Sequence, residues 1–172
     1  TNEGWISFQE YFVKRKCAPK ILDLKYSGIE KAKINLDAIK AIESADFLVI
    51  APSNPLVSIK PIIDIPHFKK FLKNKRKKVI AVSPIISGRT VKGPANRMLK
   101  QLGYKSDAFA ALNFYKDICD NFVIDVSDKN LKDRFKKTGQ SCHMSYILMN
   151  SLKDKKSLAQ TLIKICSEKR EN

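Results

Sequence analysis

The sequence lacks an apolar run of the roughly 20 residues that a membrane-spanning helix needs. Its first residues, "TNEGWISFQEYFVKRK", are polar and mixed in charge, unlike a secretory signal. Internal repeats and low-complexity linkers are also absent, and 44% of its 172 residues are hydrophobic. We therefore expect a cytoplasmic protein without a membrane partner, folded as a single domain over residues 1–172.

Cysteine is scarce, and no two cysteines form a C-x-x-C pair. The four residues are far apart in the chain: Cys17, Cys119, Cys142 and Cys166. This spacing excludes a cysteine-based metal signature and a dense disulfide framework. We expect reduced thiols that serve as small hydrophobic side chains.

The common catalytic and nucleotide-binding signatures G-x-S-x-G, P-loop and G-x-G-x-x-G are absent. The only histidines, His67 and His143, lie outside the two loops described below, so we expect structural roles for both. Asp46 opens a predicted strand, where a ligand contact is possible but solvation is commoner. Asp125 and Asp128 form a carboxylate pair of the kind that binds Mg²⁺, although helix capping is the interpretation that we favour.

Acidic residues are too few to balance the 33 lysines and arginines, which leaves a net charge of +16. A field of this sign attracts polyanions. The densest basic run, 69–78, is not interleaved with aromatic residues as a nucleic-acid stacking platform would be. We favour a solvated lysine-rich surface and do not expect a nucleic-acid partner, with a basic RNA-binding domain as the alternative. A protein that binds nucleotides or phosphorylated small molecules explains the charge equally well.

Four short apolar runs predict strands, at 20–26, 46–51, 78–83 and 121–126. Their near-continuous apolar character is typical of a parallel sheet that is buried on both faces. Helical patterns lie between and after them, at 35–45, 66–75, 94–103, 107–118, 128–139 and 154–169. Asn35 or Asp37 can cap the first of these helices. The alternation predicts an α/β fold with a mainly parallel sheet and helices on both faces.

A loop rich in proline and short polar side chains follows the predicted strand 46–51. It contains Ser53, Asn54 and Pro55, and Ser58 follows shortly. Proline restricts the backbone and lowers the entropy that a loop loses when it binds a ligand. Serine and asparagine supply short hydrogen-bonding groups, so the loop is a candidate phosphate- or nucleotide-binding site.

A second loop of similar character follows the predicted strand 78–83. Its candidate ligand residues are Ser83, Gly88, Arg89, Lys92 and Gly93. Glycine lets backbone N–H groups approach an anion, and the two cations add full charge. Ligands of α/β sheets bind beyond the carboxyl ends of the strands, where both loops lie. For either loop alone we favour a rigid strand-to-helix turn, but two such loops in succession favour a shared anion site.

Four segments resemble one family, the 2-phospho-L-lactate transferases of deazaflavin coenzyme (coenzyme F-420) biosynthesis. They are "EGWISFQEYFVKRK", "PSNPLVSIKPII", "VIAVSPIISGRTVKGPANRMLKQLG" and "FYKDICDNFVID", in the order of the family, and they span residue 3 to about 160. More distant relatives that bind sugar nucleotides carry a G-P-G-S-type loop in place of "PSNP". The resemblance implies a Rossmann-like, three-layer α/β fold.

The resemblance also implies an activity, in which a phospholactyl or phosphoenolpyruvyl group passes from a guanosine-diphosphate-linked donor to the deazaflavin Fo. GMP is released, Mg²⁺ is the implied cofactor, and a homodimer is the implied assembly. Ser53, Asn54 and Pro55 match the "SNP" loop of the family, and the second loop completes the GDP side of the crevice. The alternative is a regulator of the same superfamily that binds a nucleotide or sugar nucleotide without turnover.

Two departures from the family pattern are visible. The family often has Asp where this chain has Asn96, which leaves the role of that position open. Family members also begin with a glycine-rich segment and metal-binding aspartates that do not match this chain. We expect the chain to be the C-terminal part of a longer transferase, without its own metal ligands or catalytic residues and inactive by itself.

Overall fold

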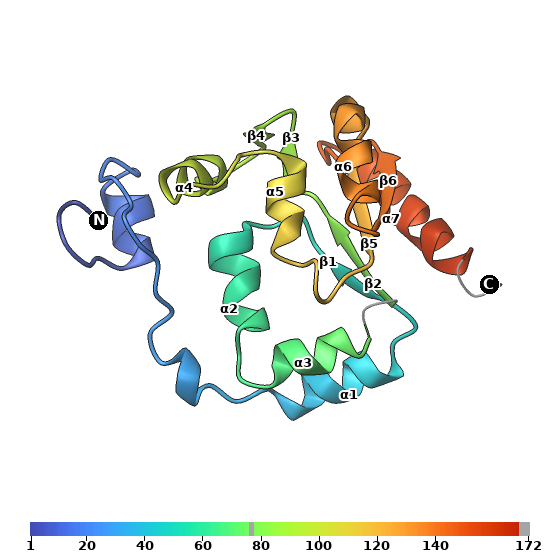
Figure 1. Cartoon of the computed structure of the whole chain (residues 1–172), viewed down its shortest axis with the longest axis horizontal. Helices are drawn as coiled ribbons and strands as arrows, with labels where there is room; N and C mark the ends of the chain where they lie inside the picture. The colour runs from blue at the N-terminus through green and yellow to red at the C-terminus, as the bar shows by residue number, and fades with distance from the viewer. Residues whose placement is uncertain (76–77, 169–172) are drawn as a thin grey trace.

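The computed structural model describes residues 1–75 and 78–168 (Figure 1). Its centre is a four-stranded parallel sheet of order β1-β2-β5-β6. The strands are β1 (Leu48–Ile50), β2 (Val79–Val82), β5 (Asn121–Asp125) and β6 (Ser141–Ser145). A separate antiparallel hairpin is formed by β3 (Ile85–Ile86) and β4 (Arg89–Thr90).

Helices connect and follow the strands. The α-helices are α1 (Leu36–Ser44), α2 (Lys60–Ile63), α3 (Phe68–Lys73), α4 (Ala95–Gln101), α5 (Ala108–Asn113), α6 (Lys132–Lys136) and α7 (Leu152–Ser167). The described residues also contain two π-helical turns, η1 (Glu10–Lys14) and η3 (Pro55–Ile59). They contain the 3₁₀ segments η2 (Ile29–Lys31) and η5 (Val126–Leu131) as well.

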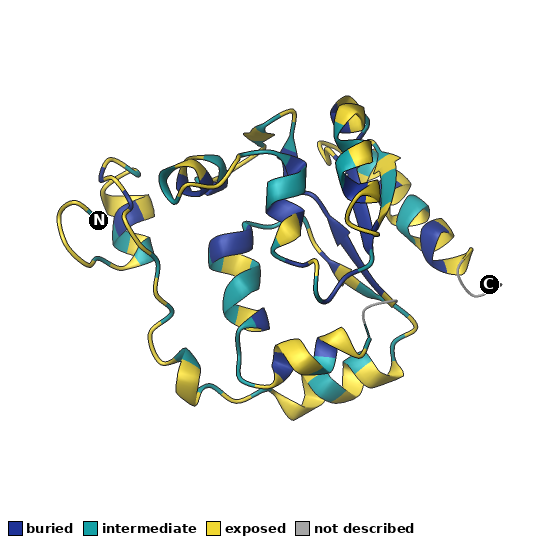
Figure 2. Cartoon of the chain, in the orientation of Figure 1, coloured by how far each residue is buried: buried dark blue, intermediate teal, exposed yellow. Residues whose placement is uncertain are grey.

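The sheet is covered on both faces, because alternate residues of its strands point in opposite directions. Val79, Ala81 and Phe122 join the core that contains α2, α3, α5 and α6. Ile80 and Val123 face the opposite way and pack against α7. Figure 2 shows the two central strands as the most deeply buried part of the chain. The predicted α/β fold with helices on both faces is confirmed.

The first 27 residues form no strand and lie to one side of the sheet (Figure 1). Tyr11 and Ile21 are buried there, against Leu56 of η3 and Met98 of α4. The predicted strand at 20–26 is therefore wrong. Its backbone is bonded to side chains instead: Lys20 N donates to Asn2 Oδ1 at 2.7 Å, and Ile21 N donates to Gln101 Oε1 at 3.0 Å.

The other three predicted strands are confirmed as β1, β2 and β5. The prediction missed β6, because its sequence "SCHMS" has no apolar run. This strand lies at the edge of the sheet. It also missed η3 and α2, which occupy the stretch interpreted as a loop. A proline lies in the first turn of each element. Proline is favoured there because the backbone N–H that it lacks would have no helical partner at these positions.

The six predicted helices all contain helical segments, with shifted ends. Asn35 caps α1 by accepting from the backbone N–H groups of Asp37 and Ala38, which decides between the two capping candidates. The prediction 128–139 covers part of η5 and the whole of α6. Two parts of the predicted segments lie outside the described residues: 76–77 in the basic run, and Lys169 at the end of the last predicted helix.

All four cysteines lie within the described residues, and none of them forms a disulfide there, as expected. Cys119 and Cys166 are buried in the two cores that flank the sheet. Burial raises the pKa of the Cys142 thiol to about 11. Within residues 1–75 and 78–168, no helix is both long and apolar enough to cross a membrane.

Candidate functional site

The two predicted loops meet at one cavity beyond the carboxyl ends of β1 and β2. The cavity, which we call the loop cavity, has a volume of about 260 Å³. Its lining residues come from four stretches of the chain: Pro52 and Asn54; Ser83, Pro84 and Ile86; Thr90, Val91, Lys92 and Ala95; and Ile147, Leu148 and Met149. β1 and β2 are adjacent and parallel, so the chain after each strand leaves the sheet on the same side. Asn54, Ser83 and Lys92 of the predicted site line this cavity together.

The first loop is shaped by Asn54. Its side-chain oxygen accepts the Leu56 N–H at 2.9 Å and so caps η3, while its amide nitrogen lies 3.6 Å from the sulfur of Met98. Pro55 is buried in the first turn of η3 and does not line the cavity. Ser58 is exposed on η3 and does not line the cavity either. Ser53 is also outside the lining, although its neighbour Pro52 is part of it.

The second loop begins at Ser83, which is almost fully buried. The Ser83 hydroxyl donates to the Ile85 carbonyl at 2.9 Å and accepts the Ile85 N–H at 3.1 Å. Its own backbone N–H continues the sheet by bonding to Val123 O at 2.9 Å. Ser83 therefore fixes the point at which the chain turns out of β2.

The β3–β4 hairpin turns through Ser87 and Gly88, whose φ angles are 48° and 73°. A two-residue hairpin turn of this kind requires positive φ at both positions, which glycine adopts without strain. Gly88 and Arg89 lie in the hairpin outside the cavity lining, and Gly93 adjoins the lining residue Lys92. Lys92 and Arg89 are exposed and take part in no ion pair among the residues that the structure describes.

Two carboxylates hold segments that line the loop cavity. The prediction treated them only as caps or metal ligands. Asp125 accepts N–H bonds from Ser127 at 3.0 Å and from Ile147 at 3.2 Å, so it caps η5 and holds the segment 147–149. Asp128 is also buried, but it accepts the Ser87 N–H and holds the hairpin. The position of Asp125 at a strand end was the available signal for this role.

The pKa values of these two carboxyl groups shift in opposite directions. Burial raises the pKa of Asp128, and the nearby charges of Asp125 and Asp107 raise it further. The hydrogen bond from the Ser87 N–H lowers this pKa, but by less. Burial also acts on Asp125, but hydrogen bonds from Ser127 and Ile147 outweigh it and lower its pKa. At neutral pH, Asp128 is therefore the carboxylate whose ionised form the fold disfavours.

Sequence comparison shows to which family the chain belongs. The sequence model of the family "2-phospho-L-lactate transferase CofD" matches residues 1–165. The chain belongs to this family. It is 35% identical over 165 residues to the 2-phospho-L-lactate transferase of Methanococcoides burtonii, covering 96% of this chain and 53% of that protein.

Two further relatives of the same name agree. The transferase of Methanocaldococcus jannaschii is 37% identical over 161 residues, with 94% of this chain and 50% of the relative covered. That of Methanococcus maripaludis strain C5 is 39% identical over 160 residues, with 92% and 50% covered. The chain thus spans about half the length of the curated relatives that it matches.

The structure shows what Asn96 does in this member of the transferase family. Its side-chain amide donates to the Gly88 carbonyl at 2.6 Å, which ties α4 to the hairpin turn. An ionised aspartate cannot donate such a bond. The Ser106 hydroxyl reaches the same carbonyl at 3.5 Å.

The remaining candidates lie away from the loop cavity. Asp46 precedes β1 and is therefore at the opposite end of that strand. His67 is exposed at the start of α3, and His143 is half-buried in β6; neither lines the cavity. Within the described ranges, no three His, Cys, Asp or Glu side chains are grouped so that they could share a metal ion. Asp125 accepts the Ser127 N–H as the cap of η5, which is the role that we favoured, whereas Asp128 bonds to the hairpin instead.

Proposed function

We propose that this chain provides the nucleotide-binding part of a 2-phospho-L-lactate transferase. The reaction moves a 2-phospho-L-lactate or phosphoenolpyruvate group from a guanosine-diphosphate-linked donor to the hydroxyl of the deazaflavin Fo, with release of GMP, in coenzyme F-420 biosynthesis. Family membership supports the transfer. One observation supports the site: Asn54 and Ser83, from loops after adjacent parallel strands, line the same cavity as Lys92.

The lining of the loop cavity is divided in a way that suits a nucleotide. Asn54, Thr90 and Lys92 supply polar and cationic groups on the side of the two loops. Leu148 and Met149 form an apolar wall, although both are more than a third exposed. Exposed apolar side chains beside a polar pocket are typical of a surface that a ligand covers. The diphosphate would contact the loops, and the nucleoside would contact the apolar wall.

The chemistry of this chain at the loop cavity is charge neutralisation and positioning. Lys92 is the one ionisable side chain among the described residues that line the cavity. An ammonium beside the diphosphate stabilises the charge that accumulates on departing GMP. No general base is present among these lining residues, and we assign no step to magnesium, since the described residues offer no cluster for it.

Calorimetric titration with GDP tests the site. We expect the wild-type chain to bind GDP and Lys92→Ala to bind it about tenfold more weakly, because a cation–phosphate contact contributes about 1.5–3 kcal/mol when partly desolvated. Lys70→Ala is the matched control: Lys70 is exposed on α3, outside the cavity lining. Equal affinity of both variants would remove Lys92 from the site.

The wider proposal has its own readouts. We expect no GMP release from the donor and Fo by this chain alone, measured by chromatography of the nucleotides. We expect a dimer by sedimentation. Tight RNA binding that is lost steeply with salt, together with no GDP binding, would instead support the RNA-binding alternative.

A further inference from the structure

The helix α4 contacts both loops of the loop cavity. The sulfur of Met98 lies 3.6 Å from the side-chain nitrogen of Asn54 in the first loop. On the same helix, Asn96 donates to the carbonyl of Gly88 in the second loop, and Ala95 lines the cavity itself. The two loops are therefore fastened to one short helix, which fixes where each lies relative to the other.

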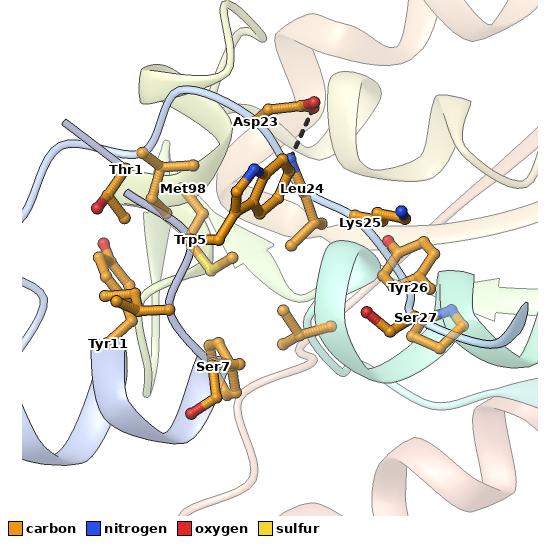
Figure 3. A pocket seen from close by; sticks show the side chains of 15 residues that line it. Thr1, Trp5, Ser7, Tyr11, Asp23, Leu24, Lys25, Tyr26, Ser27 and Met98 are labelled. Atoms are coloured by element: carbon orange, nitrogen blue, oxygen red, sulfur yellow. Dashed lines mark hydrogen bonds between the residues drawn. The ribbon is translucent and has the colours of Figure 1, made fainter. Parts of the chain in front are cut away.

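α4 is itself anchored to the N-terminal segment. Met98 is 1% exposed, and Figure 3 shows it among side chains of that segment such as Trp5, with which it lines a pocket. Gln101 Oε1 accepts the Ile21 N–H at 3.0 Å, and the Arg97 guanidinium donates to another backbone carbonyl of the segment at 3.3 Å. A side chain on α4 can hold a loop in place, because the helix that carries it is supported on its other side.

Asn96 acts on the turn of the β3–β4 hairpin. Its amide lies 2.6 Å from the Gly88 carbonyl, whereas the Ser106 hydroxyl reaches the same carbonyl only at 3.5 Å. From another side, Asp128 accepts the N–H of Ser87. Two neighbouring residues of one turn are thus each bonded to a side chain from a different element.

Lys92 follows this turn in the chain, and its position depends on the hairpin. The Thr90 hydroxyl donates to the Gly93 carbonyl at 3.2 Å, which closes a tight loop that contains Lys92. Lys92 lines the loop cavity and Asn96 does not. Any effect of Asn96 on a ligand in the cavity must therefore pass through the hairpin and the lysine that it carries.

We propose that Asn96 is a positioning residue for Lys92. By holding the hairpin turn on α4, it fixes the direction from which the ammonium meets the diphosphate before the nucleotide binds. A hairpin without this bond would lose more conformational entropy on binding, and the affinity would fall. The inference rests on the proposed function, because that function assigns the diphosphate to Lys92.

Hydrogen exchange tests the hold on the hairpin without any nucleotide. We expect Asn96→Ala to speed amide exchange in the segment 85–90 by at least about threefold, because the turn opens more often. Asn113→Ala is the matched control: Asn113 is an exposed asparagine on α5, outside the cavity lining. Exchange at the same rate in the two variants would overturn the inference, whatever the chain binds. Circular dichroism verifies that both are folded.

Calorimetry with GDP tests the consequence for binding. We expect Asn96→Ala to weaken GDP binding about three- to tenfold, the value of one hydrogen bond, and Asn113→Ala to leave it unchanged. Asn96→Asp has nearly the same size, but an ionised carboxylate cannot donate to the Gly88 carbonyl. We therefore expect it to lose at least as much affinity as Asn96→Ala. Wild-type affinity in Asn96→Asp would contradict the proposal.

A double-mutant cycle tests whether Asn96 acts through Lys92. Once Lys92 is replaced by alanine, the hairpin has no ammonium left to position. We expect Lys92→Ala and the double variant with Asn96→Ala to bind GDP within about twofold of each other. Losses that add in the double variant would mean that Asn96 acts independently of Lys92, as a purely structural contact would, and would overturn the proposal.

These outcomes separate the inference from the proposed function. If Lys92→Ala weakens GDP binding and Asn96→Ala does not, the GDP site stands and Asn96 has no positioning role. If Asn96→Ala speeds hairpin exchange but leaves GDP affinity unchanged, Asn96 is a structural contact only. If neither variant changes GDP affinity, Lys92 is not in the site and both proposals are wrong.

Discussion

Both carboxylate oxygens of Asp128 accept the backbone N–H of Ser87, at 3.0 and 3.2 Å. The two residues are 41 positions apart in the sequence. Ser87 has a φ of 48°, in the left-handed region, where a side chain other than glycine or asparagine is uncommon. The contact holds the hairpin turn next to the loop cavity, and the experiments below test its consequences.

Removing the carboxylate should loosen the hairpin. We expect Asp128→Ala to lower the free energy of unfolding by about 1 kcal/mol, since the Ser87 N–H can turn to water, and to weaken GDP binding several-fold. Urea unfolding and calorimetry measure the two effects. Asp133→Ala is the control, because Asp133 on α6 is exposed and its ion pair with Lys136 is long, at 3.8 Å. If Asp128→Ala and Asp133→Ala bind GDP with equal affinity, Asp128 does not contribute to the GDP site.

The raised pKa of Asp128 gives a pH dependence of known sign. The folded chain holds this proton more tightly than the unfolded chain, so the contribution to stability is complete below about pH 4 and is lost as pH rises through the raised pKa. Asp128→Asn cannot ionise. We expect the free energy of unfolding of the wild type, minus that of Asp128→Asn, to fall between pH 4 and neutrality. A flat difference would show that the pKa is not raised.

Asn54 has two roles that two substitutions can separate. Asn54→Asp keeps an oxygen that caps η3 but places a negative charge in the loop cavity, so we expect near-normal stability and at least a tenfold loss of GDP affinity. Asn54→Ala removes the cap and should cost about 1 kcal/mol of stability. Thermal unfolding and calorimetry distinguish them. Normal GDP binding by Asn54→Asp would place the diphosphate elsewhere.

Two glycines with nearly the same φ angle form a pair for comparison. Gly88 in the hairpin and Gly139 before β6 have φ angles of 73° and 72°. Alanine at either position takes a left-handed conformation that costs about 1–2 kcal/mol. We expect Gly88→Ala and Gly139→Ala to have similar melting temperatures, with GDP affinity reduced only in Gly88→Ala. Reduced affinity in both would mean that the effect comes from global destabilisation.

Local signals in the sequence were sufficient for most of the fold. The apolar runs of β1, β2 and β5 and the capped pattern of α1 were recognisable because buried parallel strands and amphipathic helices have distinct periodicities. The segment 20–26 has the same apolar character, but its side chains pack against η3 and α4 rather than into the sheet. Periodicity cannot distinguish these two kinds of burial.

The candidate site divides in the same way. That two proline-rich loops follow neighbouring strands is readable from the order of residues, and their meeting at one cavity follows from the parallel sheet. Asp128, by contrast, contacts a residue 41 positions away, and Asp125 holds Ile147 from 22 positions away. Nothing local in the sequence specifies such partners.

By itself the sequence determined three of the strands, the positions of most helices and the resemblance to a family, and it predicted an anion site between the two loops. The tertiary structure decided which groups face the loop cavity and which carboxylates hold its walls. The reason is physical: backbone propensity depends on neighbours in the chain, whereas burial, hydrogen-bond partners and pKa values depend on groups that only folding brings together.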